Sequence, residues 1–201
     1  GAEMSDARAI IHPAWLRLTH WINAAATVVL VLSGWRIYNA SPLFSFSFPD
    51  VITLGGWLAG ALLWHFFAMY VLVANGLLYL GLNLLSGRFR RKFFPLSLRA
   101  IGTDLRAALS LKLHHTDLSV YNSLQKLAYL LMVLDTILLV VSGLAIWKSV
   151  QFPLLRELMG GYDMARVVHF YAMAALLAML AVHLLMVALV PRTVLLMLRG
   201  R

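Results

Sequence analysis

Long apolar stretches without charged side chains dominate this chain of 201 residues. Residues 18–35, 51–87 and 167–191 contain no Asp, Glu, Lys or Arg, and residues 127–147 contain only Asp135. Each run has at least the length that a helix needs, roughly 17–25 residues, to cross the hydrocarbon core of a bilayer. The runs lack the alternation of membrane strands, and backbone groups in lipid must bond to one another, which favours helices over a barrel.

This pattern predicts an all-α integral membrane protein, a four-helix bundle that forms a single domain over residues 1–201. Hydrophobic residues make up 62% of the chain and charged residues 12%, which does not fit an ordinary soluble domain. The second run is too long for one straight crossing, so its ends should tilt, kink or lie at the interface. The crossings are expected over residues 16–39, 53–86, 122–147 and 162–190.

The net charge of +9 reflects membrane topology rather than an affinity for nucleic acid. If the N-terminus is cytoplasmic, 13 of the 17 Lys and Arg residues fall on the cytoplasmic side and only Arg36, Lys148, Arg156 and Arg166 fall outside. This positive-inside bias predicts that both termini are cytoplasmic. The cytoplasmic basic section 88–115 has the spacing of an interfacial helix that contacts anionic lipid, with docking of a cytoplasmic partner as the alternative.

The absence of cysteine limits the chemistry of the chain. It excludes disulfides, iron–sulfur clusters held by thiolates and haem attached through a C-x-x-C-H motif. Any haem must therefore be bound non-covalently.

Four histidines lie inside the apolar runs, where polar groups are costly and usually mark a ligand or a pathway. His169 and His183 are fourteen residues apart, so they share one helix face about 21 Å apart along its axis. His20 and His65 lie in other runs and can supply opposite ligands. Two imidazoles fill both axial positions of a haem iron, which leaves electron transfer as its role. We therefore expect two bis-histidine haem b groups between the helices and no catalytic residue.

An internal repeat predicts how the histidines pair. Residues 27–34 match residues 136–143 without a gap, and the segment at His65 matches the segment at His169. Two copies of one helical hairpin, related by an axis along the membrane normal, bring His65 and His169 to equal depth near the outer face. His20 lies sixteen residues below Arg36, and His183 lies seventeen below Arg166, so these two also match in depth. The predicted pairs are His65 with His169 outside and His20 with His183 inside.

Several other residues near the predicted haems have two interpretations. Gly34 and Gly143 either let the backbone approach the flat macrocycle or serve ordinary helix packing. Arg36 and Arg166, near the outer helix ends, either pair with haem propionates or anchor the helices at the interface. Asp135 is either a proton relay to a quinone or a structural hydrogen-bond acceptor.

These residues, taken in order, resemble a known family. They are residues 17–21 (RLTHW), Ser33-Gly34, His65, residues 124–129 (LQKLAY), Ser142-Gly143, His169 and His183. The set is similar to that of the prokaryotic di-haem b-type cytochromes that anchor nickel-iron hydrogenases, formate dehydrogenases and thiosulfate reductases in the bacterial inner membrane. The resemblance extends over nearly the whole chain, from His12 to Arg192.

The resemblance implies four core helices, two haem b groups and a quinone pocket near one haem, usually the cytoplasmic one. It also implies an extracytoplasmic redox enzyme or cytochrome as partner. The chain would then be the electron-transfer subunit of an oxidoreductase, with quinone reduction or quinol oxidation as its own reaction. The partner, the direction of electron flow and a homodimeric state are left open. The polarity of residues near a helix end suggests a quinone site lined by Asn23, Tyr121, Asn122, Gln125 and Lys126.

Two haem-free functions are the alternatives. One is a proton or solute transporter in which the histidines and Asp135 form a relay. The other is a membrane anchor that only recruits a partner, for which the histidines would be dispensable. Both predict a colourless protein.

Overall fold

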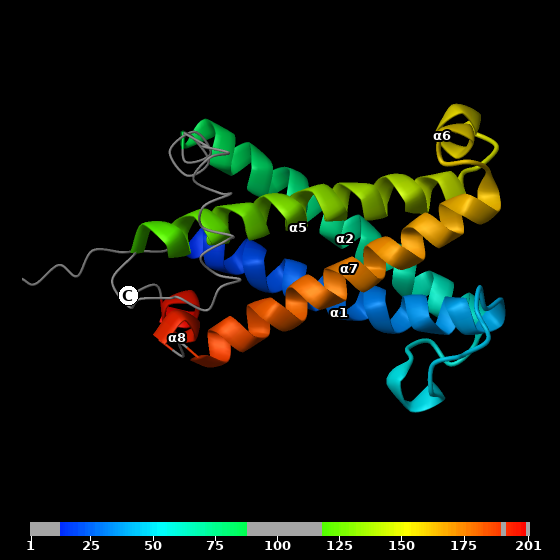
Figure 1. Cartoon of the computed structure of the whole chain (residues 1–201), viewed down its shortest axis with the longest axis horizontal. Helices are drawn as coiled ribbons and strands as arrows, with labels where there is room; N and C mark the ends of the chain where they lie inside the picture. Colours follow the sequence, from blue (N-terminus) through cyan, green and yellow to red (C-terminus); the bar gives the residue numbers. More distant parts are fainter. Residues whose placement is uncertain (1–12, 88–117, 190–191, 200–201) are drawn as a thin grey trace, which may run out of the picture. The chain divides into compact units, whose positions relative to one another are not determined.

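The computed structural model describes residues 13–87, 118–189 and 192–199, and every regular element within these ranges is helical (Figure 1). The four long helices are all apolar and have the length to cross a membrane, which confirms the prediction of four spans. Three short helices accompany them. The elements are α1 (Ala14–Ala40), η1 (Asp50–Ile52), α2 (Leu58–Leu85), α5 (Leu118–Trp147), α6 (Pro153–Leu158), α7 (Tyr162–Leu189) and α8 (Arg192–Arg199).

The buried positions of the long helices are mostly small residues, whereas large apolar side chains are exposed. Ala61 and Ala68 on α2 are 0% and 2% exposed, but Leu63 and Phe67 on the same helix are 73% and 63% exposed. Small residues at helix contacts and large apolar residues facing outward are typical of helices packed in lipid. The core of this protein is therefore made by close backbone approach rather than by bulky side chains.

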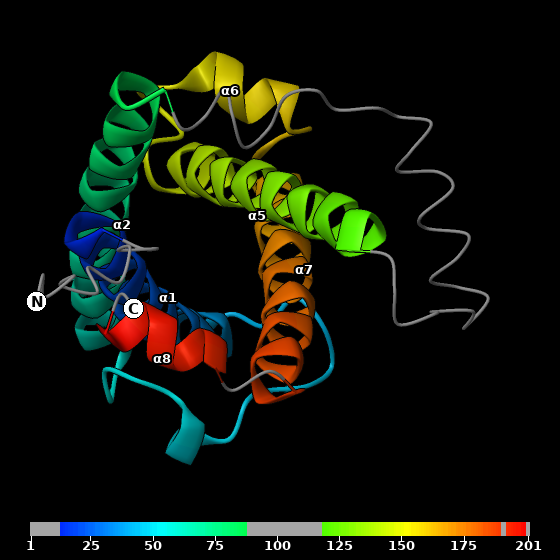
Figure 2. The same ribbon diagram turned by 90° about the vertical axis from the view of Figure 1, so that its left-hand side faces the viewer.

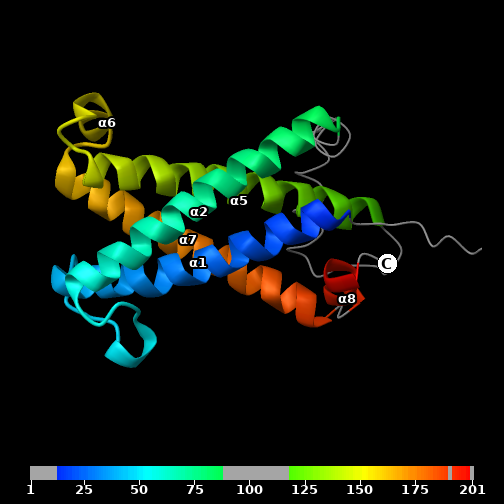
Figure 3. The same cartoon turned by 180° about the vertical axis from the view of Figure 1, so that it is seen from behind.

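The described chain divides into two compact units. The first contains residues 1–82 and 183–201, so it holds α1, most of α2, the last turns of α7, and α8. The second contains residues 83–182 and holds α5, α6 and most of α7. Each unit is built on one pair of long helices, as the internal repeat predicts. Within the first unit, α2 runs beside α1 at an angle (Figure 3).

The start of α2 corrects the predicted boundary at residue 53. Residues 50–52 form η1, and Gly55 and Gly56 adopt φ angles of 113° and 70°, which side chains with a Cβ atom rarely adopt. A Cβ atom at Gly55 would also lie 2.4 Å from the backbone of Ala61. The helix can begin only after this turn, at Leu58.

The second unit repeats this turn before its last long helix. Gly160 and Gly161 have φ angles of 88° and 96°, and α7 begins directly afterwards at Tyr162. The glycine pairs thus occupy equivalent places in the two halves. The described part of α5 runs from Leu118 to Trp147, and that of α7 runs from Tyr162 to Leu189.

Two parts of the chain remain: the basic section and the last described helix. The basic section 88–115 lies outside the described residues. The helix α8 was not predicted, because eight residues are too few to show a clear apolar period. Its position beside the first turns of α1 is visible in Figure 2.

Candidate functional site

His65 on α2 is held by two consecutive residues of α1. Its Nδ1 atom lies 3.0 Å from Ser33 Oγ, and Ser33 also bonds the backbone carbonyl of Val29 at 2.6 Å. A Cβ atom built on Gly34 would lie 3.4 Å from His65 Cε1, so the glycine faces the edge of the ring. The serine thus contacts one ring nitrogen, and the glycine leaves room for the ring beside it.

His169 on α7 is held in the same way by α5. Its Nδ1 atom lies 2.9 Å from Ser142 Oγ, which bonds the carbonyl of Leu138 at 2.6 Å. A Cβ atom on Gly143 would again lie 3.4 Å from the Cε1 atom of the histidine. We call Ser33-Gly34 and Ser142-Gly143 the Ser-Gly seats, and His65 and His169 the Ser-linked histidines.

The role of these serines was missed by the sequence analysis, although both appear in its repeat. Ser33 and Ser142 are both 0% exposed. Burial of a hydroxyl in an apolar helix requires a polar partner. The signal was present: the repeat matches the two serines in the first and third apolar runs and the two histidines in the second and fourth.

His20 and His183 face each other within the first unit. Their ring centres lie 6.3 Å apart, with 59° between the ring planes. His20 comes from the second turn of α1, and His183 from the last turns of α7. Among the described residues, no hydrogen bond is found to either ring. We call these two the facing histidines; the structure thus brings one of the predicted pairs together.

The remaining predicted pair, His65 with His169, joins residues of different units and stays a prediction. No group of three or more His, Cys, Asp or Glu side chains that could hold a metal occurs in the described parts of the chain. Within the described residues, the facing histidines are therefore not joined by the further His, Cys, Asp or Glu ligands of a zinc-type site.

The end of α8 is attached to α1 next to the facing histidines. Arg17 Nη1 donates to the carbonyl of Leu198 at 2.6 Å, and Trp21 Nε1 donates to the carbonyl of Met197 at 3.3 Å. The carbonyls at a helix C-terminus lack partners within the helix and attract cations. The Trp21 ring also meets His20 edge-on, with ring centres 5.4 Å apart. The last described helix is therefore attached to two residues of α1, Arg17 and Trp21, that lie within three positions of His20 in the sequence.

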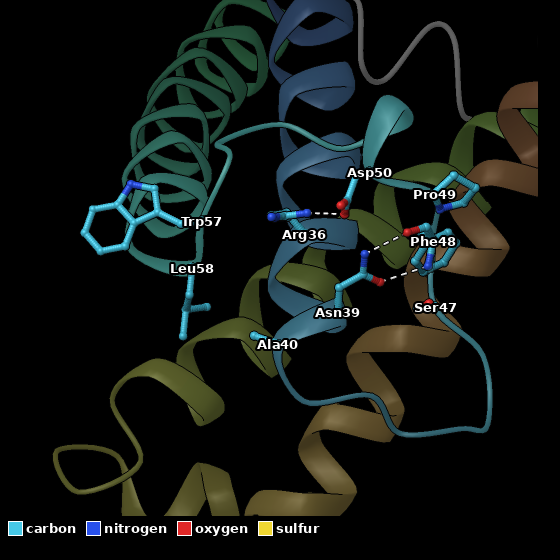
Figure 4. A pocket seen from close by; sticks show the side chains of 9 residues that line it. All are labelled: Arg36, Asn39, Ala40, Ser47, Phe48, Pro49, Asp50, Trp57 and Leu58. Carbon is cyan, nitrogen blue, oxygen red and sulfur yellow. Dashed lines mark hydrogen bonds and ion pairs between the residues drawn. The ribbon is translucent and has the colours of Figure 1, made fainter.

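Arg36 holds the α1–α2 connection in place. Its guanidinium group pairs with Asp50, and Asn39 makes two 2.8 Å hydrogen bonds to the backbone of Phe48 (Figure 4). Arg36 also donates to the carbonyl of Gly56. Arg36, Asn39, Phe48 and Asp50 are among the residues that line a cavity of about 650 Å³. Arg36 thus has partners within the protein, and its predicted pairing with a haem propionate stays a prediction.

The other predicted site residues fall into three groups. Arg166 is half-buried on α7, and its role toward a propionate is not tested. The residues predicted to line the quinone site on α5 have side chains outside the described part of the structure: they are Tyr121, Asn122, Gln125 and Lys126. Asp135 is half-buried, and its Oδ2 atom has no hydrogen-bond partner among the described residues, so that oxygen does not act as a structural acceptor there.

Asn23 belongs to a buried polar cluster on the α1–α2 pair. Asn75 is 7% exposed, and its Nδ2 atom donates to Asn23 Oδ1 and to the carbonyl of Thr19, both at 2.7 Å. The sequence analysis placed Asn23 at the quinone site but gave no role to Asn75. An amide inside an apolar run was the available signal, since such a group must find partners in lipid.

Comparison with known proteins identifies the family. The family model described as prokaryotic cytochrome b561 matches residues 11–200. The chain belongs to the prokaryotic cytochrome b561 family. A protein of Azospira oryzae, named as the candidate protein-methionine-sulfoxide reductase subunit YedZ1, is 63% identical over 190 residues, which are 94% of this chain and 96% of that protein. No solved structure matches the chain significantly.

Membership in this family confirms the resemblance seen in the sequence. This cytochrome b561-type chain is a multi-pass protein of the bacterial inner membrane. A cytochrome b carries haem b, and the absence of cysteine means that the haem is bound non-covalently. Electron transfer is the function that the family implies.

Proposed function

We propose that this cytochrome passes electrons between the membrane quinone pool and an extracytoplasmic redox enzyme, with two haem b groups held by four histidines. One pair would be His20 with His183, and the other His65 with His169. The observation that carries the proposal is the pair of facing imidazoles on α1 and α7.

The spacing of the facing histidines fits a metal between them. Metal–imidazole bonds are about 2.0–2.1 Å long, so two imidazoles on opposite sides of one metal have ring centres about 6 Å apart. The rings of His20 and His183 are 6.3 Å apart. Two histidines in direct hydrogen-bond contact, with the nitrogens about 2.9 Å apart, would bring the ring centres closer together.

The Ser-linked histidines fit the second haem for a different reason. Each ring has its Nδ1 atom at a serine, at 3.0 Å for His65 and 2.9 Å for His169, so the opposite ring nitrogen is the one that can serve as a ligand. The glycines of the Ser-Gly seats leave the ring edge uncovered by a side chain. Their equivalent positions in the repeat support a shared cofactor.

Bound haem b would supply one-electron transfer, and His20, His65, His169 and His183 are the residues that would hold it. The protein's contribution is to hold four neutral imidazoles and to exclude water and other ligands. Apolar helices surround the histidines, and the rings arise from three different spans. We infer from the 13-to-4 distribution of cations that both termini are cytoplasmic, with the facing histidines on that side.

The quinone site is proposed near the facing histidines, where Asn23 contributes polar groups. Asn75 holds the Asn23 carbonyl oxygen, which leaves the Asn23 amide nitrogen as a hydrogen-bond donor for a quinone oxygen. Tyr121, Asn122, Gln125 and Lys126 remain the proposed residues on α5.

The name of the Azospira relative suggests the partner. That protein is named as a subunit of a protein-methionine-sulfoxide reductase. We propose that the partner of this cytochrome is likewise an extracytoplasmic enzyme that reduces methionine sulfoxide in proteins. Such an enzyme consumes electrons, so the direction of flow would be from quinol to the cytochrome and then to the partner.

The test is the absorbance of the full-length protein purified in detergent. We expect a reducible b-type spectrum, about two haems per chain by pyridine haemochrome assay, and reduction of the haem by added duroquinol. A variant with alanine at all four histidines should be colourless. A wild-type protein that is colourless after expression with adequate haem supply would refute the proposal and favour a haem-free transporter or anchor. A coloured protein that quinol does not reduce would refute the quinone assignment.

A further inference from the structure

We propose that Ser33 and Ser142 are positioning residues that fix which nitrogen of His65 and His169 carries the ring hydrogen, so that Nε2 becomes the metal ligand. The inference rests on the proposed function, because it concerns ligands of the proposed haem. It concerns how the protein orients these two rings before a cofactor binds, which follows neither from family membership nor from the name of the relative.

The direction of the Ser33–His65 hydrogen bond follows from the other contact of the serine. A hydroxyl group has one hydrogen to donate, and a backbone carbonyl can only accept. Ser33 Oγ lies 2.6 Å from the carbonyl oxygen of Val29, so the hydroxyl hydrogen points there. Ser33 Oγ must then accept the 3.0 Å bond from His65 Nδ1. With the hydrogen on Nδ1, the lone pair that binds a metal is on Nε2.

The second unit repeats the arrangement atom for atom. Ser142 Oγ donates to the carbonyl of Leu138 at 2.6 Å and lies 2.9 Å from His169 Nδ1. Both serines are fully buried in membrane-spanning helices, where water cannot replace a lost hydrogen bond. The tautomer of each ring is therefore fixed by the protein, independently in each half.

The glycine of each seat leaves room for the edge of the ring. The ring atom Cε1, which lies between the two nitrogens, is 3.4 Å from the Cβ position of Gly34 or of Gly143. A side chain that extends beyond Cβ would meet the ring edge. The serine therefore sets the protonated nitrogen, and the glycine leaves space for the ring in that orientation.

Thr136 on α5 shows that a hydroxyl residue can donate to a carbonyl of its own helix without also contacting a histidine. Thr136 Oγ1 donates to the carbonyl of Met132 at 2.7 Å, and no other polar contact of Thr136 is found among the described residues. The contact to a ring nitrogen is what distinguishes Ser33 and Ser142. Thr136 thus supplies a matched control.

The expected consequence is a change in haem properties. An acceptor on the outer nitrogen of a ligating histidine makes the ligand more basic, and loss of such a partner typically weakens metal binding 10–100-fold. A more basic ligand favours ferric iron, so removing the serine should raise the midpoint potential. A tenfold weakening confined to the ferric state corresponds to about 59 mV for a one-electron couple.

The experiment compares Ser33→Ala, Ser142→Ala and Thr136→Ala in the full-length, haem-loaded protein in detergent. Redox titration gives the midpoint potential of each haem, and electron paramagnetic resonance (EPR) reports the ligand planes of the low-spin ferric state. We expect both serine variants to raise the potential and shift the EPR signal of the same haem, while Thr136→Ala changes neither. Ser33→Thr and Ser142→Thr keep the hydroxyl and should restore the wild-type values.

Two outcomes would overturn the inference while leaving the proposed function intact. One is a wild-type protein with two histidine-dependent haems in which both serine variants behave like Thr136→Ala. The other is a serine variant that shifts the haem of the facing histidines instead. If the alanine variants do not accumulate, Ser33→Cys and Ser142→Cys replace the hydroxyl by a weaker acceptor and should give a smaller shift in the same direction; cysteine variants with wild-type potentials would count against the inference. A wild-type protein without haem would instead refute the proposed function.

Discussion

The Ser-linked histidines and the facing histidines are held in different ways. His65 and His169 are each fixed by the neighbouring long helix of their own unit, through a serine and a glycine. His20 and His183 face each other from α1 and the last turns of α7, which are 163 residues apart in the chain, and no hydrogen bond to either ring is found within the described ranges.

The difference separates local from long-range determinants of a ligand site. A Ser-linked histidine needs only one pair of adjacent spans, and each half of the repeat supplies that pair. The facing histidines require the first and last spans to associate, together with the α8 contacts of Arg17 and Trp21. Orientation of the ring is thus specified by a pair of consecutive long helices in the first case and by packing of segments far apart in the sequence in the second.

Replacing single histidines should give the largest effect and would test the pairing directly. His20→Ala and His183→Ala should each remove the same haem, and His65→Ala and His169→Ala should each remove the other, because a haem with one imidazole lost is no longer low-spin and bis-histidine. Haem content should fall from about two per chain to about one. EPR and redox titration identify the component that is lost.

Two further points make this experiment decisive. Replacing His12, which lies outside the predicted spans, should change neither component and serves as the control. If His65→Ala and His169→Ala removed different components, the proposed pairs would be wrong even though all four residues could still be ligands.

Filling the space beside a Ser-linked histidine should have an intermediate effect. Gly34→Val places side-chain atoms against His65, whose Cε1 atom already lies 3.4 Å from the Cβ position. Overpacking of this kind typically costs about 1–3 kcal/mol. The variant should lose the haem of the Ser-linked histidines to apomyoglobin faster than the wild type, while the other haem is retained.

Gly76→Val is the matched control on α2, because no described heavy atom lies within 4 Å of its Cβ position. Both variants introduce the same side chain into a long helix, so a general effect on membrane insertion would appear in both. Equal haem loss from Gly34→Val and Gly76→Val would show that the contact with the ring is unimportant.

Weakening the attachment of α8 should have the smallest effect and should act only on the facing histidines. Arg17→Met removes the hydrogen bond to the carbonyl of Leu198 but keeps an unbranched side chain. A hydrogen bond of this kind contributes about 1 kcal/mol, which corresponds to roughly a fivefold change in an equilibrium constant. We expect the haem of the facing histidines to be released a few-fold faster from this variant.

Arg199→Met, at the exposed end of the same helix, removes a cation without removing that bond and should resemble the wild type. Faster release of the other haem from Arg17→Met, or an equal effect of Arg199→Met, would mean that α8 does not act through His20.

The parts of the fold that follow from burial in lipid could be predicted from the sequence. A span needs a long uncharged run whatever its neighbours are, so α1, α2, α5 and α7 were all predicted. The exact start of α2 could not, because it depends on the left-handed backbone at Gly55 and Gly56. Glycine in a helix-like apolar run is compatible with either a helix or a turn.

The candidate site, too, could be predicted from the sequence only in part. The histidines stood out because an ionisable group in an apolar run is costly, and the family model supports the haem that they suggested. Ser33 and Asn75 did not stand out as partners, because a single serine or asparagine in a helix has many ways to satisfy its polar groups. Their partners, His65 in one case and Asn23 in the other, are set by which helix faces meet.

The distance in sequence between His20 and His183 also determines when the facing histidines can meet during synthesis. The seat for His65 can form once the first two spans have left the ribosome, whereas His20 must wait for 163 further residues before its counterpart exists. At about 5–20 residues per second, that wait lasts roughly 8–33 s. Throughout this interval the nascent chain carries His20 without His183, and a premature stop codon anywhere before residue 183 leaves His20 permanently without its counterpart.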